Sequence, residues 1–298
     1  MKKIFDYLFI KFLSEESKNR IEATILMVAI ASFMIHLIVI FLVDFKLIVL
    51  DDKANLFINP IAAIYTPFSF ILVYEVYLLI YYLPRSITVY IGKQYEIMTL
   101  ILIRKLFKDL SGLKLTPDWF AVKGDMVFTY DLISTVVLFF LIYVFYSLNP
   151  QKEETAKTKP EISVGTSTFI RMKNYIATLL VPVFVFMASY SLFVWVDSTF
   201  FASDAALGKA SHVDGIFFEQ FFTILILADV LLLLFSFLRT DRFSIVIRNS
   251  GFVISTILIK ISFGTEGLLN SVLIVVAVVF GVTILAIQKR YDRLGFNS

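Results

Sequence analysis

Two acidic residues lie within long apolar stretches of this chain, where a charged side chain is energetically unfavourable unless it has a partner or a function. Glu75 precedes Arg85 by ten residues, and Asp229 precedes Arg239 by ten residues. At 1.5 Å per helical residue, each acid is about 15 Å from that basic residue, near the centre of a hydrocarbon core about 30 Å thick. A charged carboxylate at that depth costs about 2.5–3.5 kcal/mol unless it faces water or a partner. The two acids therefore predict a binding site for a proton or a monovalent cation.

Hydroxyl groups follow both acids on the same predicted helix faces. Tyr82 and Ser236 each come seven residues after an acid, about 20° away around a helix. They could supply hydrogen bonds beside Glu75 and Asp229. The alternative is structural, with each acid clamping two neighbouring helices by a hydrogen bond or an ion pair.

Three further ionisable residues are candidates with simpler explanations. His36 lies in the middle of the first apolar stretch and could exchange protons with Glu75, although a hydrogen bond to a neighbouring helix is the simpler role. Lys93 and Glu96 are three residues apart, so they can pair along one helix. The pair could gate an entrance, whereas extension of Lys93 to the membrane interface needs no function.

Sequence signatures of catalysis and of cofactor binding are absent. The chain has no cysteine and only two histidines, which excludes thiolate metal sites and disfavours haem ligation within one chain. No HExxH, GxSxG or glycine-rich phosphate loop occurs. We therefore expect no enzyme activity, no resident metal and no cofactor.

The second half of the chain resembles the first. Glu75 recurs as Asp229 at an offset of 154, and Leu102-Ile103-Arg104 recurs as Leu258-Ile259-Lys260 at an offset of 156. Offsets this constant indicate an internal duplication. Duplicated membrane bundles place shared sites at the interface between repeats.

Composition indicates a membrane protein, because 59% of the residues are hydrophobic and 17% are charged. The predicted fold is an all-α polytopic membrane protein with about eight transmembrane helices in two parallel four-helix repeats. A short amphipathic helix, lying in the interface or packed on the bundle, precedes them. The expected spans are approximately 21–43, 60–83, 87–107, 128–148, 174–196, 216–238, 246–263 and 267–287.

Basic residues predict the orientation of the spans. With the N-terminus in the cytoplasm, 17 Lys and Arg residues fall inside and nine fall outside, so both termini are expected inside. A second arrangement, with 86–110 as a cytoplasmic amphipathic helix, would make the number of spans odd. The predicted divisions are a first repeat over 1–148, a polar cytoplasmic linker over 149–169, and a second repeat over 170–298.

The sequence thus favours a transporter or channel for a proton, a monovalent cation or a small solute, located in the plasma (inner) membrane. The alternative is a non-catalytic membrane sensor, or the membrane subunit of a larger complex. The expected partners are the lipid bilayer and a second copy or a partner subunit. Nucleic acid is not expected, because the basic residues are dispersed along the chain.

Single cysteines test this topology, since the natural chain contains none. Thr155→Cys in the linker should react with a membrane-impermeant maleimide only after the cytoplasmic face is exposed. Thr116→Cys in the loop after the third span should react in intact cells. The opposite pattern would contradict the predicted orientation.

Overall fold

The computed structural model describes residues 2–47, 63–110, 123–149, 164–200, 213–237, 243–265 and 267–294. These residues form nine helices and no strand, so the all-α prediction is confirmed for the described part of the chain. The helices are α1 (Lys2–Leu13), α2 (Glu15–Asp44), α3 (Tyr65–Tyr82), α4 (Ile87–Leu110), α5 (Lys123–Leu148), α6 (Val164–Phe200), α8 (Val213–Phe237), α9 (Phe243–Phe263) and α10 (Leu268–Arg293).

Five of the described helical segments are long and apolar enough to cross a bilayer, which identifies the chain as an integral membrane protein. Helices α3 and α8 contribute the shorter apolar stretches Thr66–Tyr82 and Gln220–Phe235. The number of spans, eight, stays a prediction. The five segments are Glu15–Asp44, Asp125–Leu148, Ile170–Met187, Phe243–Phe263 and Leu268–Arg293.

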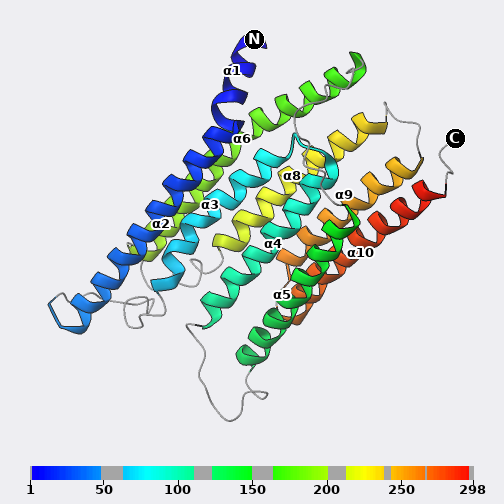
Figure 1. Ribbon diagram of the computed structural model, residues 1–298. Helices are drawn as coiled ribbons and strands as arrows, with labels where there is room; N and C mark the ends of the chain where they lie inside the picture. Colours follow the sequence, from blue (N-terminus) through cyan, green and yellow to red (C-terminus); the bar gives the residue numbers. More distant parts are fainter. Residues whose placement is uncertain are drawn as a thin grey trace.

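Sequential helices lie side by side in each half of the chain (Figure 1). In the first half α2 packs on α3, α3 on α4, and α4 on α5. In the second half α6 packs on α8, α8 on α9, and α9 on α10. The two halves meet where α3 contacts α6 and where α5 contacts α10. Both termini lie at the same end of the bundle (Figure 1), which we call the terminal end.

Local sequence accounts for several helix ends. The Ser14 side chain accepts a hydrogen bond from the Ser17 amide at 3.2 Å, which caps α2 and separates it from α1. Pro84 follows α3 and cannot continue its hydrogen-bond pattern. Ser86 then accepts from the Val89 amide at 3.3 Å at the start of α4. Gly267 has a φ of 63°, a conformation that glycine adopts readily in the turn before α10.

Two sequence predictions differ in detail from these helices. Helix α6 begins at Val164, so residues 164–169 of the predicted linker are helical, while 150–163 lie outside the described residues. The predicted N-terminal amphipathic helix is present as α1, which packs on α2 and α6. The Tyr77 hydroxyl on α3 donates to the Phe12 carbonyl of α1 at 2.7 Å and fastens α1 to the bundle.

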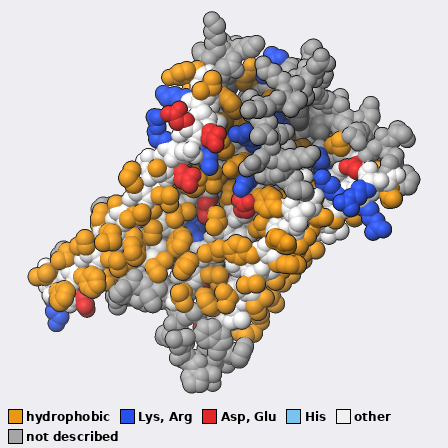
Figure 2. Space-filling view, viewed as in Figure 1, with side chains coloured by type: hydrophobic (Ala, Val, Ile, Leu, Met, Phe, Trp, Pro, Cys, Tyr) orange, Lys and Arg blue, Asp and Glu red, His pale blue; other side chains and the backbone are white. Residues whose placement is uncertain are grey.

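The surface matches a protein that contacts lipid. Hydrophobic side chains cover much of the face seen in Figure 2, and charged side chains gather toward the terminal end. Large apolar residues such as Met34, Phe140 and Phe186 are exposed along α2, α5 and α6. In water such a surface would drive aggregation, whereas in a bilayer it contacts acyl chains.

The halves are packed together by a large residue facing a small one. Tyr95 of α4 is buried, and its hydroxyl contacts the Ser255 hydroxyl of α9 at 2.8 Å. A Cβ atom at Gly281 of α10 would lie 2.9 Å from Tyr95 Cζ and closer still to its hydroxyl oxygen. Phe145 of α5 packs against the same ring in an edge-to-face arrangement, with centroids 5.3 Å apart. The missing side chain at Gly281 is what admits Tyr95.

We expect Gly281→Ala to lower the free energy of unfolding by about 1–3 kcal/mol, because the methyl group displaces Tyr95. Thermal unfolding in a neutral detergent measures the loss. Tyr95→Phe should recover part of it in the double variant. Gly264→Ala is the matched control, because its Cβ would meet only an ordinary contact at 3.6 Å. Equal melting temperatures for the two alanine variants would contradict this account.

Candidate functional site

Glu75 pairs with a buried base on the neighbouring helix. Its Oε2 atom lies 3.8 Å from Nη1 of Arg104, and the two side chains are 3% and 7% exposed. The Arg104 guanidinium also donates to the Phe68 carbonyl of α3 at 3.5 Å. Because two opposite charges are buried together, the cost of bringing either into the bundle is offset by the other. This contact clamps α3 to α4.

Arg104 differs from what a basic residue near the end of a span ordinarily does, which is to extend its side chain to the membrane interface. The backbone of Arg104 lies six residues before Leu110, the last residue of α4, and so toward the end of the helix. Its side chain nevertheless runs inward along the α3–α4 contact and meets Glu75. The corresponding Lys260 of α9 makes no ion pair with Asp229 among the described residues.

Asp229 has neutral partners and lies at the junction of three helices. Its Oδ2 atom accepts from the Gln94 amide of α4 at 3.4 Å, and the Thr256 hydroxyl of α9 donates to the Gln94 carbonyl oxygen at 2.9 Å. Asp229, Gln94 and Thr256 are all buried. Gln94 thus bridges the second-half helices α8 and α9 from the first half of the chain.

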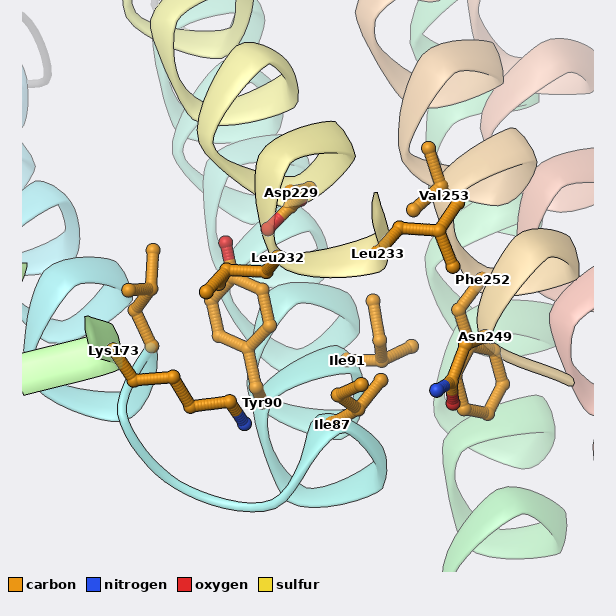
Figure 3. Close-up of a pocket in the computed structure, with 11 residues that line it drawn as sticks. Ile87, Tyr90, Ile91, Lys173, Asp229, Leu232, Leu233, Asn249, Phe252 and Val253 are labelled. Carbon is orange, nitrogen blue, oxygen red and sulfur yellow. The ribbon is translucent and has the colours of Figure 1, made fainter. Parts of the chain in front are cut away.

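A small pocket borders Asp229 and runs toward the terminal end (Figure 3). The Asp229 carboxyl group and the Tyr90 hydroxyl point toward each other, and Lys173 of α6 approaches from the other side of the ring. Leu83 and Ile87, which flank the turn between α3 and α4, complete that end of the lining. The cavity volume is 20 Å³, enough for about one water molecule. We call this cavity the Asp229 pocket.

The ammonium group of Lys173 is held in place at the mouth of this pocket. Lys173 is buried and its Nζ atom donates to the Arg85 carbonyl at 2.9 Å, in the turn between α3 and α4. It interacts electrostatically with Asp229, although the described contacts include no direct ion pair between them. The positive charge of Lys173 therefore partly offsets the negative charge of Asp229, although the two groups are not in direct contact.

The two acids predicted to act as a pair have different surroundings. Glu75 faces a buried guanidinium, as the clamp alternative expects. Asp229 faces an amide, a phenol and a water-sized cavity. The acids occupy matching sequence positions, but Asp229 lines the Asp229 pocket and Glu75 does not.

Tyr82 lies with the Lys93–Glu96 pair rather than with Glu75. Lys93 Nζ is 2.7 Å from Glu96 Oε2 on α4 and 5.4 Å from the Tyr82 ring centroid. The Tyr146 hydroxyl of α5 donates to Glu96. The lysine and glutamate side chains are 27% and 34% exposed. These four residues form a partly exposed cluster between α3, α4 and α5.

The remaining predicted residues, His36 and Ser236, are not among the residues that line the Asp229 pocket. His36 of α2 is buried and hydrogen-bonded to the Thr66 hydroxyl of α3. Thr66 is nine residues before Glu75, about 13 Å along the helix, so His36 makes the helix–helix contact that was its simpler role. Ser236 lies in α8, but its side chain is outside the described part of the structure.

Another buried acid, which the sequence analysis overlooked, lies toward the other end of the bundle. Asp131 of α5 is fully buried and pairs with Lys105 of α4 at 2.8 Å. The Ser271 hydroxyl of α10 donates to its other oxygen. Asp131 sits in an apolar stretch like Glu75 and Asp229, so the same search for acids within spans would have found it.

Comparison with known proteins gives no match to a family model, to a curated protein or to a solved structure. The site must therefore be interpreted from its own geometry. Within the described residues, no group of three His, Cys, Asp or Glu side chains could hold a metal ion. The expectation that the chain needs no metal or cofactor stays a prediction.

Removing Arg104 should be costly because it leaves the Glu75 carboxylate buried beside an uncharged side chain. We expect Arg104→Met to lower the free energy of unfolding by about 3–5 kcal/mol, and the Glu75→Gln/Arg104→Met double variant to lose less. Chemical unfolding in mixed micelles measures both. Lys260→Met is the matched control at the corresponding position of the second half, and equal losses at 104 and 260 would contradict a buried clamp.

Proposed function

We propose that this protein is a proton-linked membrane transporter or channel of the plasma (inner) membrane, and that Asp229 is its proton-binding residue. The observation that carries the proposal is the Asp229 pocket, where a buried carboxyl group borders a cavity between the two halves of the chain. A carboxyl group inside a span is costly, and such groups commonly mark ion or proton pathways.

The chemistry of the pocket favours a proton over a metal cation. Sodium-like and larger hard cations require several oxygen ligands at once. Asp229 and Tyr90 offer a carboxylate and a phenol, while the Gln94 carbonyl already accepts from Thr256. The positive charge of Lys173 also repels a second cation. A proton needs only the carboxylate, and the water-sized cavity would deliver it.

Access to Asp229 is proposed from the terminal end. The pocket lining extends from Asp229 to Leu83 and Ile87, which flank the turn at that end. Ile87 precedes Gln94 by seven residues, about 10 Å along α4, and Gln94 contacts the carboxylate. A proton would therefore travel about 10 Å from the end of the bundle before it reaches the acid.

Release toward the other end would require movement between the halves. From Asp229, polar contacts continue through Gln94 of α4 to Thr256 of α9. The preceding residue of α9, Ser255, donates to the Ala277 carbonyl of α10 at 2.7 Å. The next buried polar group on α10 is Ser271, which contacts Asp131. Six residues, about 9 Å, separate Ala277 from Ser271. We propose that a shift of α9 and α10 against α4 and α5 opens this gap.

The duplicated architecture is part of the proposal. Each half packs its helices in the same sequential order, which supports two four-helix repeats. Helix α4 is not among the described helices that are apolar enough to cross a bilayer by composition, but it packs between α3 and α5 (Figure 1), which supports a buried eighth span over the alternative interfacial helix. The basic side chains at the terminal end support a cytoplasmic location for both termini.

A non-catalytic membrane component, either a sensor or a subunit of a larger complex, is the second candidate. The Glu75–Arg104 clamp favours it, because this pair neutralises one of the two predicted acids and leaves that acid a purely structural role. In that case Asp229 would also serve packing, and a second copy or a partner subunit would be required for activity.

Proton flux into liposomes separates the two candidates. The purified chain should move protons down an imposed potential, and Asp229→Asn should reduce this flux to that of empty liposomes while the protein stays folded, because asparagine keeps an oxygen for Gln94. Glu22→Gln is the control acid, since Glu22 binds the Tyr74 hydroxyl away from the pocket.

Two results would contradict the proposal. Wild-type flux from Asp229→Asn, together with a lower melting temperature, would make the acid a packing residue. Absence of flux from the wild-type protein, with sodium and potassium gradients as well as protons, would favour the membrane component.

A further inference from the structure

A basic groove lies where α5 and α10 end, on the seam between the two halves. Its lining combines Ser147 and Leu148 of α5 with Lys289, Arg290 and Arg293 of α10. Ala286 and Leu294 provide apolar contacts, and the volume is 510 Å³. In Figure 2, Lys and Arg side chains gather where α10 ends. The groove is separate from the Asp229 pocket, which is lined by other residues.

The three basic side chains are not neutralised within the described structure. None of Lys289, Arg290 and Arg293 pairs with a described acidic residue. The acid nearest in sequence, Asp292, accepts from Ser244 of α9 at 3.2 Å and from Gln288. Its charge is thus engaged toward α9, and the groove keeps three uncompensated positive charges.

The groove is at the depth of lipid head groups. Lys289 follows Leu268, the first residue of α10, by 21 residues, about 31 Å along the helix. The hydrocarbon core is about 30 Å thick, so Lys289 and the two arginines would stand at its boundary. Basic pockets between helices at this level are suited to anionic head groups.

Exposed apolar stripes run from the groove into the span of each helix. On α5 the face of Ser147 continues through Tyr143 and Phe140, both exposed. On α10 the face of Arg290 continues through Ile287, and further along through Val279. A soluble anion needs no such surface, whereas the acyl chains of a lipid would lie along it.

We infer that this groove binds the head group of one anionic phospholipid, whose phosphate is held by Lys289, Arg290 and Arg293 and whose acyl chains follow α5 and α10. The Ser147 hydroxyl donates to the Tyr143 carbonyl at 2.6 Å, so it can only accept a hydrogen bond from the head group. Because α5 and α10 are a contact between the halves, the lipid joins the two halves at the terminal end. The inference does not depend on proton transport.

Native mass spectrometry of the full chain in neutral detergent tests it, with dioctanoyl phosphatidylglycerol as the anionic probe and dioctanoyl phosphatidylcholine as the zwitterionic one. We expect one phosphatidylglycerol to bind roughly tenfold more tightly than phosphatidylcholine. Replacing Lys289, Arg290 and Arg293 together by Gln should weaken phosphatidylglycerol binding about a hundredfold, since each basic residue contributes attraction. The single variants Arg290→Gln and Arg293→Gln should each lose part of it.

The matched control replaces Lys11, Lys18 and Arg20 by Gln, which removes three charges at the same end of the bundle but outside the groove. It should bind phosphatidylglycerol as the wild type does. Equal weakening by the two triple variants would overturn the site in favour of general surface charge.

Two other possible occupants of the groove, free phosphate and the linker, are tested by further measurements. Inorganic phosphate should displace phosphatidylglycerol no better than chloride at the same ionic strength, and specific displacement would identify a free-phosphate site instead.

The linker carries Glu153 and Glu154 close after Leu148 in sequence. Glu153→Gln/Glu154→Gln should leave lipid affinity unchanged, and a large gain would show that the linker itself fills the groove.

Discussion

Three polar side chains of α4, Gln94, Arg104 and Lys105, need partners inside an apolar bundle, and they find them on different neighbouring helices. Arg104 meets Glu75 on α3, Lys105 meets Asp131 on α5, and Gln94 meets Asp229 on α8 and Thr256 on α9. An unsatisfied charge or amide at this depth would cost several kcal/mol. Any rotation or shift of α4 would break several of these contacts at once. Helix α4 therefore holds its neighbours in register.

This arrangement explains why the two halves are alike in sequence but different in chemistry. Arginine at 104 reaches the acid of its own half, whereas lysine at 260 does not. Asp229 is consequently satisfied from the other half, by Gln94, and keeps a cavity at its side. A carboxyl group bound only by neutral partners can gain or lose a proton without breaking an ion pair. Under the proposed function, this difference between the halves leaves Glu75 a structural role and Asp229 the role of exchanging protons.

Much of the helical framework could be predicted, because the length of an apolar run and the residues at its ends are local properties. Glu75 and Asp229 were found in the same way, as acids within such runs. The contacts of Arg104 could not be predicted in this way, because the position of a residue's backbone says little about the direction of a long side chain. Gln94 and Tyr90 were overlooked because neutral polar residues are common in spans. Lys173 packs inside the bundle, which the sequence does not indicate because a basic residue at the edge of an apolar run ordinarily faces the membrane surface.

Packing between the halves fixes how the helices are rotated against each other, which no local sequence pattern predicts. Tyr95 enters the space above Gly281 and contacts Ser255, beside Gln94 and Thr256 on the same two helices. The residue of α9 that corresponds to Tyr95 is Gly251, which has no side chain to make the reciprocal contact. This one-sided fit against α10, with the Ser255 contact on α9, constrains the rotation of α4 and with it the direction in which Gln94 points. Because Gln94 must point at Asp229 for the carboxyl group to be satisfied, the tyrosine–glycine contact positions the proposed proton site without touching it.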